Sequence, residues 1–207
     1  MSDLQMGTLL SNRYHIQSLL GSGGFGVTYL ARDLQLPGHP ECVVKRLKIN
    51  SQDSQVFSIA RRLFDKEAIT LQKLGQHNQI PRLLAHFEQD KEFYLVLDYV
   101  EGEDLNNKLI NFDERKTLLL IREVLEVLRF VHEAHVIHRD IKPSNLMRRK
   151  IDGKLVIIDF GAVKEIENQA TIIETKGTTQ TICIGTPGYI PLEQMGGDPR
   201  YNSDIFA

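Results

Sequence analysis

The 207-residue sequence contains little cysteine, little net charge and no long apolar run. Its two cysteines, Cys42 and Cys183, lie far apart and in no metal-ligand spacing, which favours a reducing compartment without disulfides. A formal net charge of -2 provides no basic field for nucleic acid or an anionic membrane, so neither partner is expected. No stretch approaches about 18 unbroken apolar residues, and the N-terminus carries no export signal. We therefore expect a cytoplasmic protein without a membrane segment.

The composition is otherwise that of a globular protein. Hydrophobic residues make up 42% of the chain and charged residues 25%, so a sizeable core can form. No internal repeat or low-complexity tract interrupts the sequence. Because 207 residues lies between the usual lengths of one and two domains, the organisation has to be read from hydrophobic periodicity.

The first part of the sequence alternates like β-strands around one helix. Two β-like runs surround the glycines of 14–33, and 41–49 forms a third run after the turn-like LPGHP, which predicts an antiparallel meander. Apolar residues at helical intervals predict a helix from about residue 57 to residue 74, ended by Gly75. Residues 93–100 are again strand-like.

A boundary between two lobes is expected where the polar EGEDL follows residue 100. The first lobe, 1–100, is strand-rich with one helix, and the second, 101–207, is mainly helical. In the second lobe Asp113 is the expected N-cap of a long helix that ends near residue 134. One face of that helix carries Leu118, Ile121, Leu125, Leu128 and His132. The predicted fold class is therefore α+β.

The segment 146–160 predicts a β-hairpin with Asp152-Gly153 as its tight turn. A two-residue turn would place Leu146 opposite Asp159, with Asn145 beside that pair. A carboxylate and an amide oxygen at the open end of a hairpin suit Mg²⁺, which takes hard oxygen ligands. This arrangement requires the strand to end at Asn145, and the proline two residues earlier favours that.

Three glycines, Gly21, Gly23 and Gly26, have G-x-G-x-x-G spacing in GSGGFG. Glycine lets the backbone approach phosphate oxygens without a Cβ in the way. A dinucleotide-binding fold would need a helix after the glycines and an acid about 20 residues on, but the β-branched and aromatic VTYLA follows. The loop therefore joins two strands. It either covers a phosphate or is a plain glycine hairpin, and the spacing alone favours neither.

Glu67 projects from the apolar stripe of the predicted helix, four residues after Leu63 and four before Leu71. An unpaired carboxylate that faces a core is costly, whereas one paired with a cation can be retained. Lys45, in the middle of the apolar CVVKRL, is the natural partner because a buried ammonium also needs a counterion. The alternative is that Glu67 lies at the edge of the stripe and reaches water.

Chemically active side chains gather in HEAHVIHRDIKPSNLM. The zinc-binding helix motif needs histidines four residues apart, and HEAH has them three apart, so we expect packing or hydrogen-bonding roles for His132, His135 and His138. The acid, cation and amide that follow are Asp140, Lys142 and Asn145.

Together these segments resemble a eukaryotic-type serine/threonine protein kinase of the bacterial kind, most like those of cyanobacteria. GSGGFGVTY resembles the glycine-rich loop, CVVK the strand-three lysine motif, HRDIKPSN the catalytic loop and DFG the metal-binding motif. Glu67 falls where the family has its helix-C glutamate. The resemblance covers essentially the whole chain and implies a bilobal protein-kinase-like fold.

The resemblance also implies roles for single residues. Asp140 would accept the proton of the substrate hydroxyl, and Lys142 would steady the transferring phosphoryl group. The implied catalytic residues are Asp140, Lys142, Lys45 and Glu67, and the implied Mg²⁺ ligands are Asn145 and Asp159. The implied ATP-binding residues are Gly21, Ser22, Gly23, Gly24, Phe25, Gly26, Thr28, Val43, Lys45, the gatekeeper Leu97, and Asp98 and Val100 of the hinge.

The resemblance extends into the stretch without periodicity, 162–185, and beyond it. Arg139 resembles the arginine of kinases that are switched by activation-loop phosphorylation, because a guanidinium binds phosphate. Thr186 resembles the residue that contacts the catalytic loop, and Asp204 the aspartate of the helix that anchors it. PLE at 191–193 stands where the family usually has Ala-Pro-Glu. The candidate phosphate acceptors are Thr171, Thr175, Thr178, Thr179 and Thr181, most of which a solvated polar loop would also explain.

Two functions follow from these expectations. The first is a kinase that transfers the ATP γ-phosphate to serine or threonine of a protein substrate. The alternative is an ATP-binding regulatory module with little turnover, because the resemblance stops at SDIFA, before the last helices of the lower lobe. Such an incomplete lobe would leave the helix 113–134 partly uncovered and the chain marginally stable. A dinucleotide oxidoreductase is excluded by the strand after Gly26.

Overall fold

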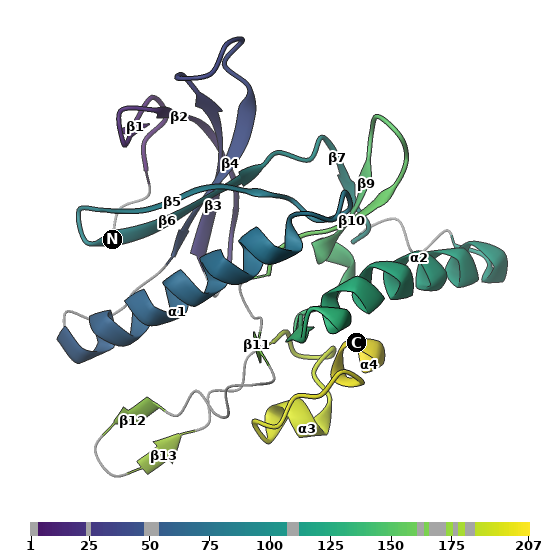
Figure 1. The fold of residues 1–207 in the computed structure, drawn as a ribbon. Helices are drawn as coiled ribbons and strands as arrows, with labels where there is room; N and C mark the ends of the chain where they lie inside the picture. The colour runs from purple at the N-terminus through teal and green to yellow at the C-terminus, as the bar shows by residue number, and fades with distance from the viewer. Residues whose placement is uncertain are drawn as a thin grey trace. The chain divides into compact units, whose positions relative to one another are not determined.

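The chain forms two compact units in a computed structural model that describes residues 4–23, 26–47, 54–106, 112–160, 164–165, 173–175, 178–180 and 185–207 (Figure 1). Unit 1 comprises residues 1–76 and 81–99, and unit 2 comprises 77–80 and 100–207. Residues 77–80 belong to unit 2 because its β-strands hold them: the carbonyl of Gln79 accepts from the N–H of Ile157 at 3.0 Å. The assignment of 1–100 and 101–207 as kinase lobes stays a prediction.

Unit 1 is built on a six-stranded antiparallel sheet in the order β1-β2-β3-β4-β6-β5. Its strands are β1 (Leu9–Leu10), β2 (Tyr14–Ser22), β3 (Gly26–Asp33), β4 (Glu41–Leu47), β5 (Leu83–Gln89) and β6 (Glu92–Asp98). The predicted meander is confirmed in β2, β3 and β4. The periodicity did not predict β1 or β5.

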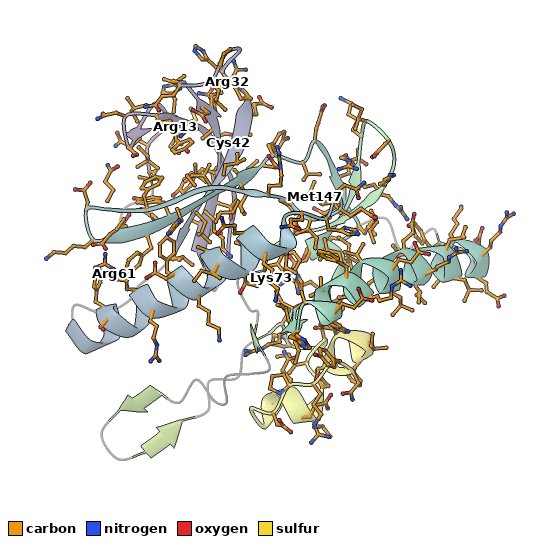
Figure 2. The ribbon with its side chains drawn as sticks, viewed as in Figure 1. Arg13, Arg32, Cys42, Arg61, Lys73 and Met147 are labelled. Carbon is orange, nitrogen blue, oxygen red and sulfur yellow. The ribbon has the colours of Figure 1, made fainter. Side chains whose placement is uncertain are left out.

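One face of this sheet forms an apolar core. The alternation of each strand sends every second side chain to that face, and the buried residues there are Leu10, Tyr14, Ile16, Val27, Tyr29, Ala31, Cys42, Val44, Tyr94 and Val96. Aromatic rings reinforce the core, because the ring of Phe87 lies 5.9 Å from that of Tyr14 and 5.2 Å from that of Tyr94. Cys42 lies on β4 of this sheet, and Arg13 lies in the turn just before β2 (Figure 2). Burial raises the pKa of the Cys42 thiol to about 11.

The helix α1 (Ser54–Leu74) packs against the sheet of unit 1 through aromatic side chains. The ring of Phe64 lies 4.9 Å from that of Phe93 on β6, and Phe57 lies 5.1 Å from the same ring. Arg61 and Lys73 mark two positions along the helix in Figure 2. The N–H of Gly75 donates to the carbonyl of Leu71 at 2.8 Å, so the helix ends at the predicted glycine.

The helix α2 (Glu114–Glu133) organises unit 2. Asp113 is its N-cap, as predicted, and its carboxylate accepts from the N–H of Lys116 at 2.8 Å. On the predicted apolar face, Leu118, Ile121 and Leu125 are 60%, 48% and 41% exposed, which agrees with the expectation that this helix is partly uncovered. The buried residues of α2 are Leu120, Val127, Leu128 and Val131, of which only Leu128 was predicted on that face. Across the described residues, no helix combines the length and apolar character needed to cross a membrane.

Short elements complete unit 2. A three-stranded sheet has the order β10-β9-β7, and β8 pairs with β11. These strands are β7 (Gly102–Asp104), β8 (Val136–Ile137), β9 (Leu146–Arg149), β10 (Leu155–Ile157) and β11 (Lys164–Glu165), with a separate hairpin of β12 (Ile173–Thr175) and β13 (Thr178–Gln180). The short helices are the 3₁₀-helix η2 (Pro143–Asn145), α3 (Leu192–Met195) and α4 (Ser203–Phe206).

The hairpin of β9 and β10 exists, but its predicted register is wrong by two residues. Leu146 pairs with Ile157, not with Asp159. The turn is longer than the predicted pair, because the N–H of Gly153 donates to the carbonyl of Arg149 at 2.8 Å and closes a wider loop. Gly153 provides the positive φ of 68° that this loop needs.

Candidate functional site

Unit 1 contributes a buried ion pair between a strand and a helix. Nζ of Lys45 on β4 lies 3.3 Å from Oε1 of Glu67 on α1. The two residues are 6% and 8% exposed, so the alternative in which Glu67 reaches water is wrong. The pair was predicted from the position of Glu67 in the apolar stripe, and it is confirmed. Across the sheet, Lys45 pairs with Thr28 of β3 and Leu95 of β6.

The glycines of the β2–β3 connection differ in what the fold requires of them. A Cβ at Gly26 would lie 2.3 Å from the carbonyl oxygen of Arg46, so the strand pairing itself excludes a side chain. In the described part of the chain, a Cβ at Gly21 or Gly23 would meet nothing within 4 Å, and neither residue has a positive φ. Ser22 ends β2, and the predicted Gly24 and Phe25 lie outside the described residues.

The predicted adenine-binding residues lie where β4 and β6 pair and where the chain leaves unit 1. Val43 and Leu97 are directly opposite each other in the sheet. Asp98 is held by Arg82, whose Nε donates to its carboxylate at 2.7 Å and whose carbonyl accepts from its N–H at 3.0 Å. Val100 begins the main part of unit 2. Their role in adenine binding stays a prediction.

Unit 2 gathers three polar side chains on the carboxylate of Asp140, which is 3% exposed. Nζ of Lys142 donates to Oδ2 at 2.7 Å, and the hydroxyl of Thr186 donates to Oδ1 at 2.6 Å. Nδ2 of Asn145 reaches Oδ2 at 3.1 Å. Lys142 also donates to the Thr186 hydroxyl at 2.7 Å, so cation, hydroxyl and carboxylate form a closed triangle. The expected contact of Thr186 with the catalytic loop is confirmed.

Asn145 and Asp159 are linked through one backbone hydrogen bond. The N–H of Ile158 donates to the carbonyl of Asn145 at 2.9 Å, and Asp159 is the next residue. The strand β9 begins at Leu146, so Asn145 lies just outside the strand, as the metal hypothesis requires. Because Nδ2 of Asn145 donates to Asp140, its Oδ1 is the amide atom suited to a cation.

The donor set of these two residues fits Mg²⁺. An amide oxygen and a carboxylate are hard ligands, and Mg²⁺ usually takes one or two protein oxygens together with phosphates and water. Within the described part of the chain, no group of three or more His, Cys, Asp or Glu side chains is arranged to hold a metal ion. The third residue of DFG, Gly161, lies outside the described residues.

His138 is completely buried beside Asp140. The N–H of Asp140 donates to its Nδ1 at 3.3 Å, and its Nε2 lies 3.4 Å from the carbonyl of Ile158, which together fit a neutral ring protonated at Nε2. Burial lowers the pKa of His138, against the opposing effect of the nearby carboxylates. The ring of Phe160 meets it edge-on at 4.6 Å.

Asp204 of α4 binds the backbone of the loop that contains His138 and Arg139. Its carboxylate accepts from the N–H of His138 at 2.9 Å and from the N–H of Arg139 at 2.7 Å, as the resemblance implied. It also lies 2.8 Å from Nε2 of His132, which confirms the expected hydrogen-bonding role of that histidine, although its partner was not predicted. A single carboxylate thereby ties three groups on two segments together.

Gln194 is a contact that sequence reasoning missed. Its side chain is 3% exposed, and Nε2 donates to the carbonyl of Arg139 at 2.7 Å. Its neighbour Glu193 accepts from the hydroxyl of Ser203 at 2.9 Å. A glutamine in a short four-residue helix has no periodicity to reveal its burial, so no signal in the sequence pointed to it.

The candidate phosphate acceptors remain predictions. Thr171 and Thr181 lie outside the described residues. Thr175 and Thr178 pair with each other across the β12–β13 hairpin, and Thr179 pairs with Glu174. These backbone positions do not rank the acceptors.

Comparison with known proteins identifies relatives over nearly the whole chain. The sequence profile of the family described as "Protein kinase domain" matches residues 14–207. Serine/threonine-protein kinase B of Synechocystis sp. is 47% identical over 206 residues, which is 96% of this chain and 35% of that protein. Serine/threonine-protein kinase PknA of Nostoc sp. is 44% identical, over 98% of this chain and 36% of its own length. The chain thus spans about a third of the length of these relatives.

Proposed function

The chain belongs to the protein kinase domain family, and from this premise we propose that it transfers the γ-phosphate of ATP to serine or threonine hydroxyls of a protein substrate. The observation that carries the proposal is the buried carboxylate of Asp140, with Lys142 and Thr186 bonded to it. Relatives named as serine/threonine-protein kinases support the choice of acceptor.

Asp140 is the proposed catalytic base. Its Oδ1 already accepts from the hydroxyl of a threonine, Thr186, at 2.6 Å, which is the same contact that an acceptor serine or threonine would make. A base has to lie within hydrogen-bonding distance of the proton that it takes. Lys142, 2.7 Å from the same carboxylate, supplies a positive charge that would steady the transferring phosphoryl group.

Lys45 and the glycines are the proposed phosphate-binding groups. The ion pair with Glu67 fixes the Lys45 ammonium, and a fixed cation stabilises phosphate charge without reorganising during the reaction. Among the described residues, none lies within 4 Å of a Cβ placed at Gly21 or Gly23, and neither glycine has a positive φ. Close approach of phosphate oxygens would account for glycine at both positions. Val43, Leu97, Asp98 and Val100 are proposed to hold the adenine.

Asn145 and Asp159 are the proposed Mg²⁺ ligands, through Oδ1 of the amide and the carboxylate. Mg²⁺, when bound, neutralises negative charge on the ATP phosphates. The contribution of the protein is orientation: Asn145 is buried and held by its hydrogen bond to the carbonyl of Asp140 at 2.8 Å.

The proposal also includes a cytoplasmic location, where ATP and protein substrates are available. The buried free thiol of Cys42 is compatible with a reducing compartment. Separation of cells into cytoplasmic and membrane fractions, followed by detection of the protein, tests this part by itself.

The deciding experiment measures phosphate transfer from radiolabelled Mg²⁺-ATP to dephosphorylated casein. Asp140→Asn removes the base but keeps the shape of the side chain, and loss of a general base is expected to lower kcat by about 10²–10⁴-fold. Asp198→Asn is the matched control, because that carboxylate is exposed and pairs with Arg200, two residues away. Equal transfer by the parent and Asp140→Asn would remove the assignment. ATP binding without transfer by any variant would favour a regulatory module.

A further inference from the structure

We propose that Gln194 is a positioning residue for the reaction, because it fixes the peptide group that connects Arg139 to Asp140. The inference rests on the proposed phosphoryl transfer and assigns one further residue to it. Gln194 belongs to α3, 55 positions from Arg139 in the sequence, so the contact ties two distant segments of unit 2 together.

The backbone of Arg139 needs to be held. Its φ is 70°, in the left-handed region that is unfavourable for a residue with a side chain and that persists only where the surroundings impose it. Both backbone groups of Arg139 are hydrogen-bonded to side chains. Its N–H donates to Asp204 at 2.7 Å, and its carbonyl accepts from Gln194 at 2.7 Å. Gln194 therefore supplies one of the hydrogen bonds that hold a strained position.

The restraint reaches Asp140 through one rigid plane. The carbonyl of Arg139 and the N–H of Asp140 belong to the same peptide group, which is planar. Its oxygen is bound by Gln194 at 2.7 Å, and its N–H donates to Nδ1 of His138 at 3.3 Å. Because the Cα of Asp140 is attached to this plane, a tilt of the plane moves the carboxylate. The shorter bond, the one from Gln194, is the tighter of the two restraints.

The hydrogen bond between Gln194 and Arg139 requires a residue without a side chain at Gly185. A Cβ at Gly185 would lie 2.7 Å from Nε2 of Gln194 and 3.1 Å from the carbonyl oxygen of Arg139, and φ is +136°. The next residue, Thr186, bonds to both Asp140 and Lys142. The amide of Gln194 thus lies between the two segments whose side chains meet at the Asp140 carboxylate.

The chemistry of the side chain is as important as its size. Gln194 is 3% exposed, so water has little access to replace its N–H if the amide is removed, and the hold on the carbonyl of Arg139 would weaken. Methionine has the same length but no N–H. An ionised glutamate cannot donate a hydrogen bond, but a protonated one can. Comparing glutamine, methionine and glutamate at position 194 therefore separates the effect of packing from that of the hydrogen bond.

The test compares Gln194→Met and Gln194→Glu with the parent, using Mg²⁺-ATP and dephosphorylated casein. For Gln194→Met we expect the apparent kcat to fall about 10- to 100-fold, as for other small misplacements of a reacting group, while the KM for ATP changes less than twofold. Gln194→Glu should lose as much at pH 8 and recover several-fold relative to the parent at pH 6, because burial raises the pKa of a carboxyl and the protonated form donates. Met195→Leu, on the same helix and 48% exposed, is the control and should match the parent.

Two results would overturn the proposal. One is a folded Gln194→Met protein with kcat within twofold of the parent. The other is a Gln194→Glu protein whose activity relative to the parent does not change between pH 8 and pH 6, and this variant decides the matter if Gln194→Met fails to fold.

Failure of the proposed function is recognised separately. If the parent itself transfers no phosphate, the kinase assignment fails, and hydrogen exchange at the Asp140 amide then tests the restraint alone. Exchange at least tenfold faster in Gln194→Met than in the parent supports the positioning role, and unchanged exchange overturns it.

Discussion

The two units hold their buried charges in different ways. In unit 1 a carboxylate typically meets one cation, as in Lys45 with Glu67 at 3.3 Å and Arg13 with Asp33 at 2.6 Å. In unit 2 a carboxylate is shared: Asp140 accepts from three side chains, and Asp204 binds two backbone N–H groups and a histidine. Loss of a partner in unit 1 therefore leaves one buried charge, whereas loss of a carboxylate in unit 2 leaves several donors without an acceptor.

The largest effect is expected for the shared carboxylate of Asp204. Asp204→Ala leaves the N–H groups of His138 and Arg139 without their acceptor, and each buried donor that loses its partner costs about 1–3 kcal/mol, so the free energy of unfolding should fall by about 4 kcal/mol. Asp204→Asn keeps one acceptor oxygen and should lose about half as much. Urea unfolding measures both. A loss below about 1 kcal/mol for Asp204→Ala would contradict the idea of a shared anchor.

A somewhat smaller loss is expected in unit 1 from Lys45→Met. Removing one partner of a buried ion pair leaves the other charge uncompensated, which typically costs about 3 kcal/mol. Because the remaining penalty belongs to Glu67, the double variant Lys45→Met with Glu67→Leu should regain most of the lost stability. If urea unfolding shows that the two single losses simply add in the double variant, Lys45 and Glu67 do not act as a pair.

The units should also differ in how acid destabilises them, beginning with His138 in unit 2. Its pKa is lowered in the folded state, so below the ordinary value of 6.5 the unfolded chain binds more protons. The stability contribution is therefore complete above pH 6.5 and is lost as the pH falls through the folded pKa, by up to about 1.4 kcal/mol per pH unit. In His138→Gln the free energy of unfolding should vary less between pH 7 and pH 5. An unchanged pH profile would contradict a buried neutral ring.

The matching residue in unit 1 is Asp33, whose pKa is lowered chiefly by its hydrogen bonds with Arg13. As with His138, stability falls as the pH falls, but in a lower pH range. The stability contribution of Asp33 is complete above the ordinary pKa of 3.8 and is lost as the pH falls through the still lower folded pKa. Arg13→Gln should therefore lower the free energy of unfolding by a constant amount between pH 5 and pH 7, and the difference from the parent should shrink as the pH falls below about 4. A difference from the parent that changes with pH between 5 and 7 would remove the distinction.

The smallest effect is expected where a charge pair is exposed. Arg122 and Glu126 lie one turn apart on α2 at 3.0 Å, with side chains that are 76% and 56% exposed. Arg122→Gln should change the free energy of unfolding by less than about 0.5 kcal/mol, because water competes with such pairs. A larger loss in thermal or urea unfolding would mean that burial does not explain the difference between the units.

Local chemistry made parts of the structure predictable. The ion pair of Lys45 and Glu67 followed from a charge in an apolar stripe, and the start of α2 followed from a capping side chain at Asp113. The ion pair joins two elements, but its signal, a charge among apolar residues, can be read within each element separately, and the cap depends on α2 alone. The contact of Thr186 with the catalytic loop was implied by the family resemblance, not by any pattern within the chain itself.

Features that depend on tertiary packing were not predictable. The register of β9 and β10 is set by a five-residue loop whose closing bond, from Gly153 to Arg149, is invisible in the pattern of apolar residues. The buried stripe of α2 is decided by what it packs against, so the exposed Leu118 could not be distinguished from the buried Leu120. Gln194 is a polar residue in a short helix, and only the path of the chain brings it to Arg139.

The contrast among the glycines of unit 1 bears on how such a chain would change over generations. Gly26 is required by the carbonyl of Arg46 whether or not the protein ever meets a nucleotide. No described residue places such a demand on Gly21 or Gly23. A homologue that had lost catalytic activity but still had to fold would keep Gly26 and could replace Gly21 and Gly23. The three positions together would therefore distinguish an inactive homologue from an active one.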